Sequence, residues 1–183
     1  MIFQDESDTR ARANRLKLMV FDVDGVLSDG SLFYTDEGIE MKAFNGFDGH
    51  GLRMLQKAGI TLAIITGRKA RCVEFRMQNL GIDLLYQGIE NKLETLQNLL
   101  SQLGISADEA GFMGDDVIDL QAMDACGFSA APADSHELAK HYARVISSKN
   151  GGRGAVREVC EFILDAQGKL DAALAPYLPA PRQ

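Results

Sequence analysis

Leu16-Lys17-Leu18-Met19-Val20-Phe21-Asp22-Val23-Asp24-Gly25-Val26-Leu27 is an apolar run that ends in two carboxylates separated by one residue. The apolar part predicts a buried strand over 17–22. A buried, ionised carboxylate costs several kcal/mol unless it is paired or bound to a metal. The pair is therefore either a solvated turn or a divalent-metal site with a carboxylate nucleophile. The second interpretation places it at the carboxyl edge of a parallel sheet.

Further apolar runs alternate with helical patterns along the rest of the chain. This alternation predicts an α/β fold, a doubly wound, Rossmann-like parallel sheet flanked by helices. The expected strands after the first are 60–66, 82–86, 110–113, 128–131 and 143–146. The first expected helix starts at Asp48 and ends near Gly59, and the second starts at Gly67 and ends near Gly81. The other expected helices are 91–103, a short helix after 119, 135–141 and 155–166.

The remaining segments set the predicted boundaries of the domain. Two short strand-like runs around Asp36-Glu37-Gly38 predict a small β-hairpin insertion over 31–44, after the first strand. Residues 1–15 are charged and lack apolar periodicity, so we expect a flexible leader. Residues 16–168 form the predicted domain, and 169–183 form a tail whose proline-containing end, 175–183, should lack regular structure.

Composition excludes several classes of function. The 183 residues include 26 acidic and 19 basic ones, a net charge of −7, which disfavours general binding to nucleic acid or to an anionic membrane. No apolar run is long enough to span a bilayer, and the amino-terminal segment has no apolar core of a secretory signal. Three cysteines without C-x-x-C spacing fit a reducing compartment, so we expect a cytoplasmic protein.

Chemistry-bearing residues follow three of the predicted strands. Asp22 and Asp24 follow the first, Thr66 the second, and Asp115 the strand at 110–113, while Lys92 starts a helix. All should converge at one edge of the sheet. Alone, Thr66 fits a helix cap and Lys92 fits a surface lysine.

The residue types suggest roles in phosphoryl transfer. Asp22 and Asp115 offer the hard oxygens that Mg²⁺ prefers, and Asp22 is then placed to attack phosphorus. Asp24 can pass a proton to the leaving alcohol and take one from water. Thr66 and Lys92 can stabilise phosphate oxygens. Asp116 and Asp119 are either helix-capping residues or supporting members of the site.

These motifs together resemble those of the haloacid dehalogenase superfamily of phosphatases. They are Asp22 to Leu27, Ile65-Thr66-Gly67-Arg68, Lys92, and Gly114-Asp115-Asp116-Val117-Ile118-Asp119. The resemblance implies Mg²⁺, a phosphoaspartyl intermediate at Asp22, and metal binding through the backbone carbonyl of Asp24. In that pattern Gly67, Asp116 and Asp119 have supporting positions.

Further segments, 22–30, 44–51 and 151–158, resemble one branch that acts on sugar-acid phosphates in lipopolysaccharide inner-core synthesis. That branch lacks a cap domain, and here too 25–48 has room only for the hairpin. The resemblance implies a homotetramer in which a neighbour's hairpin closes each site. It also implies substrate contacts from Asp24, Asn45, Gly46, Phe47, Asp48, Gly49, Arg53, Arg68, Arg76 and Lys92.

Two alternatives stay open at this point. The same core motifs serve an eight-carbon sugar acid and a nine-carbon, sialic-type one. A phospho-receiver signalling domain also uses strand-end Asp residues, Thr, Lys and Mg²⁺. Its acidic pair, however, follows the first strand, whereas here Asp115 and Asp116 come last.

Overall fold

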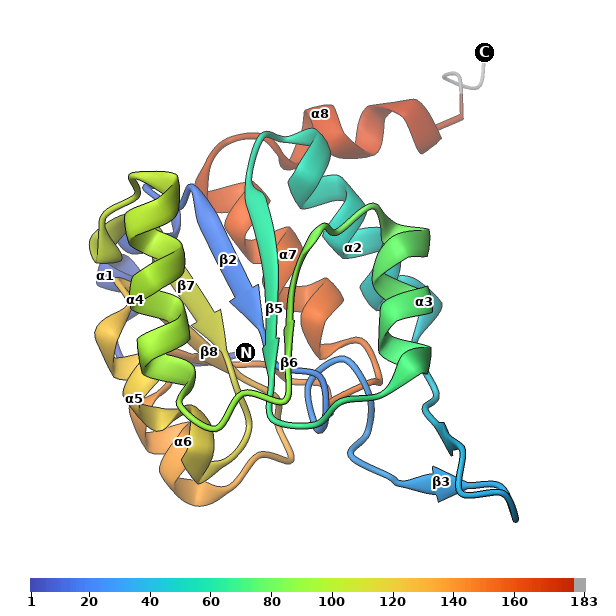
Figure 1. Ribbon diagram of the computed structural model, residues 1–183. Coiled ribbons are helices and arrows are strands. Elements are labelled where there is room, and N and C mark those ends of the chain that lie inside the picture. Colours follow the sequence, from blue (N-terminus) through green and yellow to red (C-terminus); the bar gives the residue numbers. More distant parts are fainter. Residues whose placement is uncertain (180–183) are drawn as a thin grey trace.

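The computed structural model describes residues 1–179 and has a seven-stranded sheet at its centre (Figure 1). The strand order is β1-β9-β8-β7-β2-β5-β6, and every neighbouring pair is parallel except β1 with β9. The strands are β1 Ile2–Phe3, β2 Leu18–Phe21, β5 Thr61–Thr66, β6 Leu84–Gln87, β7 Ala110–Met113, β8 Phe128–Ala131 and β9 Val145–Ile146. The predicted doubly wound parallel sheet is confirmed.

Helices cover both faces of this sheet (Figure 1). One layer contains α1 Glu6–Ala13, α2 Gly46–Lys57, α3 Arg71–Leu80 and α7 Ala155–Ala166; the other contains α4 Lys92–Leu103, α5 Leu120–Ala125 and α6 Glu137–Tyr142. Alternate residues of β2 supply the two cores, because successive strand side chains point to opposite faces. Met19 and Phe21 pack toward α2 and α7, and Leu18 and Val20 pack toward α4 and α5.

Two predicted helix starts differ from the structure. Helix α2 begins at Gly46, and its cap is Asn45, whose side chain accepts hydrogen bonds from the backbone of Phe47 and Asp48. Asp48 therefore lies in the first turn rather than at the cap. Helix α3 begins at Arg71, after an extended Ala70, instead of opening at Gly67. In both cases the pattern of apolar residues marked the helix but not its first turn.

The insertion after β2 is a hairpin, as expected. Strands β3 Phe33–Tyr34 and β4 Glu40–Met41 pair antiparallel around Asp36 to Gly38. In Figure 1 the hairpin projects from the edge of the molecule at which the arrows of β2 and β5 end. Its large apolar side chains are exposed, namely those of Leu32, Phe33, Tyr34, Ile39 and Met41.

The predicted flexible leader over 1–15 is wrong. Strand β1 pairs with β9, and α1 packs against α7. Asp5 caps α1 by accepting from the backbone N–H of Asp8, and Thr9 and Ala13 are buried. The helix presents only these small residues to the core and makes polar contacts elsewhere, such as Arg10 with Asp165, so it lacks an apolar stripe.

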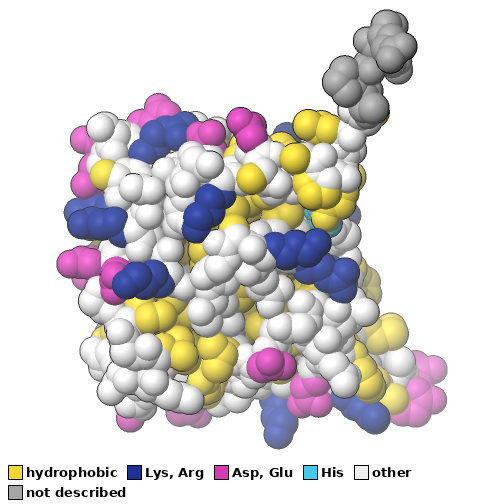
Figure 2. Space-filling view, turned by 90° about the horizontal axis from the view of Figure 1, so that it is seen from above, with side chains coloured by type: hydrophobic (Ala, Val, Ile, Leu, Met, Phe, Trp, Pro, Cys, Tyr) yellow, Lys and Arg dark blue, Asp and Glu magenta, His cyan; other side chains and the backbone are white. Residues whose placement is uncertain are grey.

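The tail is partly regular, in contrast to the prediction. Helix α8 Leu170–Leu174 continues into the 3₁₀ turn Ala175–Tyr177, whereas residues 180–183 of the predicted tail lie outside the described part. Together with α2, this segment borders a groove of about 220 Å³ that includes Met54, Ala173 and Tyr177. Figure 2 shows hydrophobic side chains gathered beside this end of the chain. Among the described residues, no helix is long and apolar enough to cross a membrane.

Candidate active site

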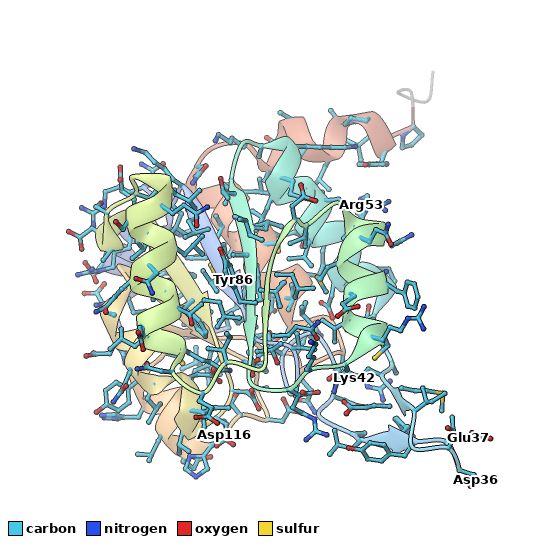
Figure 3. The ribbon with its side chains drawn as sticks, viewed as in Figure 1. Asp36, Glu37, Lys42, Arg53, Tyr86 and Asp116 are labelled. Atoms are coloured by element: carbon cyan, nitrogen blue, oxygen red, sulfur yellow. The ribbon has the colours of Figure 1, made fainter. Side chains whose placement is uncertain are left out.

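A pocket of about 260 Å³ lies at the carboxyl edge of the sheet, between the ends of β2, β5 and β7. The pocket contains most of the site residues that were predicted to follow the strand ends. In Figure 3, Asp116 lies at this edge of the molecule. Its lining is Asp22, Asp24, Gly25, Gly30, Thr66, Gly67, Arg68, Asp115, Asp116 and Ile118.

Lys92 lies beneath this pocket, between two buried carboxylates. Its Nζ is 3.0 Å from Asp22 Oδ2 and 2.5 Å from Asp119 Oδ1. Asn91 caps α4 and thereby fixes the position of Lys92 in the first turn. The other oxygen of Asp119 accepts from the backbone N–H groups of Asp115 and Asp116 at 3.0 and 3.2 Å. Both oxygens of Asp119 are thus engaged, so it braces the loop and orients the lysine.

Asp22 and Asp115 retain oxygens with no protein partner. Asp22 Oδ1 and Asp115 Oδ1 are buried and lack a hydrogen bond. With Asp119, they offer carboxylate oxygens that lie within 4.8 Å of one another. Gly25 makes room for this arrangement, because a Cβ there would lie 2.0 Å from Asp115 Oδ2. Two buried carboxylate oxygens without a hydrogen bond fit the ligands of a hard divalent cation. Asp22 and Asp115 are the side chains that can provide these ligands.

The protonation of these groups reflects burial and crowding of like charge. Burial, followed by the charge of Asp119, raises the pKa of Asp22 to about 6, against the opposing effect of Lys92. Burial and the charge of Asp22 raise the pKa of Asp115 to about 8. Burial disfavours the charged form of Lys92, but Asp22 and Asp119 outweigh it and hold its pKa above the usual value. When all three carboxyl groups are ionised, a single lysine does not balance their charge, so the ionised site favours a cation.

Asp24 is held by residues of the hairpin. Lys42 Nζ forms an ion pair with Asp24 Oδ1 and lies 2.6 Å from Glu40 Oε1. Arg68 in turn binds Glu40 at 3.0 Å and the hydroxyl of Tyr34 at 2.6 Å. Neither Lys42 nor Glu40 was predicted from the sequence. Their alternating positions in β4 and the start of the next loop carry no signal that distinguishes them from surface charges.

A glycine loop braces the chain after the two carboxylates. A Cβ at Gly151 would lie 1.8 Å from the carbonyl oxygen of Gly25, and the N–H of Gly152 donates to Val26 O at 2.9 Å. Only glycine permits this approach of one backbone to another. Helix α7 begins after this loop, and free N–H groups at the start of a helix can bind an anion. That position is taken by Asp48, which accepts from the backbone N–H of Gly154 at 3.2 Å and Arg157 at 2.8 Å.

Several predicted substrate contacts lie outside the pocket lining. Arg76 donates to Asn45 O at 3.1 Å, and Arg53 donates to Asn79 O at 2.6 Å. Gly46, Gly49, Arg53 and Arg76 border a separate depression of about 180 Å³ between α2 and α3. Phe47 is 73% exposed beside it. Within one chain, the structure brings only Asp24 and Arg68 of the predicted sugar contacts into the pocket, with Lys92 beneath it.

Comparison with known proteins agrees with this architecture. The sequence-family model for haloacid dehalogenase-like hydrolases matches residues 85–159 of this chain. The chain belongs to this family of hydrolases, as the motifs predicted. Its relatives include the 3-deoxy-D-manno-octulosonate 8-phosphate phosphatase KdsC of Escherichia coli (strain B / BL21-DE3). The two are 48% identical over 167 residues, which are 91% of this chain and 89% of that protein.

Solved structures give the same result. A 3-deoxy-D-manno-octulosonate 8-phosphate phosphatase from Moraxella catarrhalis, in complex with magnesium, phosphate and KDO, has a TM-score of 0.92 and 43% identity, and the match covers 94% of this chain and 99% of that one. A cobalt-bound deoxy-D-mannose-octulosonate 8-phosphate phosphatase from Haemophilus influenzae has a TM-score of 0.85 and 38% identity, over 88% and 94% of the two chains.

Proposed function

We propose that this protein hydrolyses 3-deoxy-D-manno-octulosonate 8-phosphate to 3-deoxy-D-manno-octulosonate (KDO) and inorganic phosphate, with Mg²⁺ as cofactor. The observation that carries the proposal is the pair of buried, unpartnered oxygens of Asp22 and Asp115 beside Lys92, in a pocket that also contains Asp24 and Thr66. The relatives that share this fold at 38–48% identity are phosphatases of this sugar acid.

The roles follow from the position of each side chain. Asp22 attacks phosphorus through a carboxylate oxygen and forms an aspartyl phosphate. Asp24, two residues further on, donates a proton to the departing alcohol and later removes one from the attacking water. The hydroxyl of Thr66 and the ammonium of Lys92 stabilise the phosphate oxygens, with Lys92 also holding Asp22 in place.

Magnesium fits the oxygen ligands of this site. Asp22, Asp115 and the backbone carbonyl of Asp24 would hold the ion, which supplies positive charge to the phosphate oxygens when it is bound. The residues of the chain alone give three carboxylates and one lysine, and that balance would repel a dianionic phosphate. This is the physical reason that the proposed reaction requires the cation.

The test is a steady-state screen of sugar phosphates with Mg²⁺. We expect turnover of 3-deoxy-D-manno-octulosonate 8-phosphate, and none above background in Asp22→Asn, which removes the nucleophile and keeps the size of the side chain. Retained activity in that variant would refute the mechanism. The nine-carbon nonulosonate 9-phosphate is the competing substrate, and faster turnover of it would reassign the specificity. A stable phosphoprotein without turnover would indicate a receiver domain instead.

The assembly and location belong to the same proposal. We infer a homotetramer in which the 31–44 hairpin packs on a neighbour and closes its site. Five exposed apolar side chains on the hairpin, and the exposed Phe47 in the first turn of α2, support such contacts. Light scattering tests the tetramer directly, since a monomer at micromolar concentration would contradict it. We place the reaction in the cytoplasm, in lipopolysaccharide inner-core synthesis.

A further inference from the structure

The two carboxylate oxygens of Asp24 have different surroundings. Oδ1 forms the ion pair with Lys42 and receives a long hydrogen bond, 3.5 Å, from the hydroxyl of Ser28. Oδ2 is buried and has no hydrogen-bond partner. The carboxylate is therefore held by Lys42 at Oδ1, whereas at Oδ2 it has only Arg68 Nε at 4.0 Å, which is beyond hydrogen-bond distance. Asp24 lines the pocket.

Lys42 is built into this position by the hairpin. Its side chain is fully buried (0% exposed), although the neighbouring β4 residue Met41 is exposed. Figure 3 shows Lys42 at the base of the hairpin, on the side of the protein body, while Asp36 and Glu37 lie at the far tip. Burying a lysine is costly unless its charge is paired. Here it has two carboxylate partners, Asp24 and Glu40.

The cluster around Lys42 is balanced in charge. Two cations, Lys42 and Arg68, face two anions, Asp24 and Glu40, and Glu40 contacts both cations. Glu40 therefore prevents Lys42 and Arg68 from imposing an uncompensated positive charge on Asp24. What Lys42 contributes is geometric: it restrains the rotation of the Asp24 carboxyl group and leaves Oδ2 as the oxygen without a hydrogen bond.

We propose that Lys42 is a positioning residue for proton transfer by Asp24, holding Oδ1 so that Oδ2 carries the proton to the leaving group. This inference rests on the proposed function. In the first step, an oxygen of Asp22 bonds to phosphorus and the phosphorus–oxygen ester bond breaks. Its electron pair stays on the alcohol oxygen, which takes the proton from Asp24 Oδ2. In the second step, water gives a proton to Oδ2 as its oxygen displaces Asp22 from phosphorus and releases inorganic phosphate.

The test compares two leaving groups in Lys42→Met. An alkyl phosphate such as KDO 8-phosphate releases a basic alkoxide that needs a proton, whereas p-nitrophenyl phosphate releases a stabilised anion that does not. The measured quantity is kcat/KM with Mg²⁺, because it reports the steps up to transfer of phosphate to Asp22. We expect at least about a tenfold fall for the alkyl ester, since general acid catalysis contributes 10²–10⁴-fold. For the aryl ester we expect less than about a threefold fall.

Two further variants make the result decisive. Lys69→Met removes an exposed lysine and should change neither rate more than about twofold, in line with an ordinary surface substitution. Lys42→Gln is measured in parallel and carries the test if Lys42→Met does not fold, as judged by circular dichroism and light scattering. Equal losses for both esters, or no loss for either, would overturn the inference. Failure of the proposed function has a different signature, namely no turnover of KDO 8-phosphate by the unmodified protein. In that case ribose 5-phosphate replaces KDO 8-phosphate as the alkyl ester in the comparison.

Discussion

Replacing Asp115 with Asn should stabilise the metal-free protein. In the folded chain the pKa of Asp115 rises from 3.8 to about 8, mainly through burial and the charge of Asp22. A carboxyl group with a raised pKa binds its proton more tightly in the folded state than in the unfolded state. The free energy of unfolding therefore falls as pH rises from about 4 to 8. Asn has the same shape without the charge, so Asp115→Asn removes this loss.

The structure sets the size of the effect. At 1.36 kcal/mol for each pKa unit, the proton that Asp115 takes up on folding opposes folding at pH 7 by up to about 4 kcal/mol, because pH 7 lies about 3 units above the unfolded pKa of 3.8. Movement of the loop and entry of water reduce this value, and we expect a gain of at least about 1 kcal/mol in the variant. For a chain of this size that corresponds to an increase in Tm of at least about 3 °C. The gain should be largest near pH 8 and vanish near pH 4.

Thermal unfolding followed by circular dichroism measures this directly. The protein and Asp115→Asn are compared in EDTA between pH 4 and 8, and again with Mg²⁺. Mg²⁺ should raise the Tm of the unmodified protein and leave that of the variant nearly unchanged, because a ligand has been removed. Asp116→Asn is the matched control, since it removes the same charge from an exposed capping side chain. A variant less stable than the unmodified protein in EDTA at pH 8 would refute the reasoning.

Two other substitutions test the contacts around the nucleophile. Lys92→Met leaves Asp22 and Asp119 buried without their cation, so in EDTA at pH 7.5 it should lower the free energy of unfolding by about 3 kcal/mol, measured by urea denaturation; an unchanged midpoint would contradict the buried ion pair. Gly151→Ala places a Cβ 1.8 Å from Gly25 O and should displace the loop that carries Asp24, with at least about a tenfold loss of phosphatase activity. The control is Gly46→Ala, whose added Cβ meets open space. This control should not change the Tm by more than a few degrees. Equal Tm and activity in Gly151→Ala and the unmodified protein would show that the loop contact is dispensable.

The convergence of Asp22, Thr66 and Asp115 was predictable from the sequence. Each residue follows an apolar run, and parallel strands place their carboxyl ends at one edge of a sheet, so no knowledge of side-chain packing is needed. The strand pairs β2–β5 and β2–β7 realise that arrangement. Lys92 was also within reach of prediction, because Asn91 and the periodic leucines mark the start of α4.

Contacts that depend on tertiary packing could not be predicted in this way. The direction of the hairpin decides whether Lys42 points to solvent or to Asp24, and two-residue strands do not encode that direction. Asp48 is a plausible cap by residue type, yet Asn45 takes that position and Asp48 binds the start of α7. Helix α1 has polar composition and is held by pairing of β1 with β9, residues that are far apart in the sequence. Each outcome depends on a partner that is distant along the chain.

The contact between Gly151 and Gly25 has a consequence for how the protein folds. The nucleophile and the glycine loop that supports it are separated by most of the chain, so this contact closes a long loop, which is slow and entropically costly. The sheet around β2, β5 and β7 can pair before that contact exists. We therefore expect refolding to restore β-structure first and catalytic competence last. Enzymatic turnover would then report completion of folding more faithfully than circular dichroism.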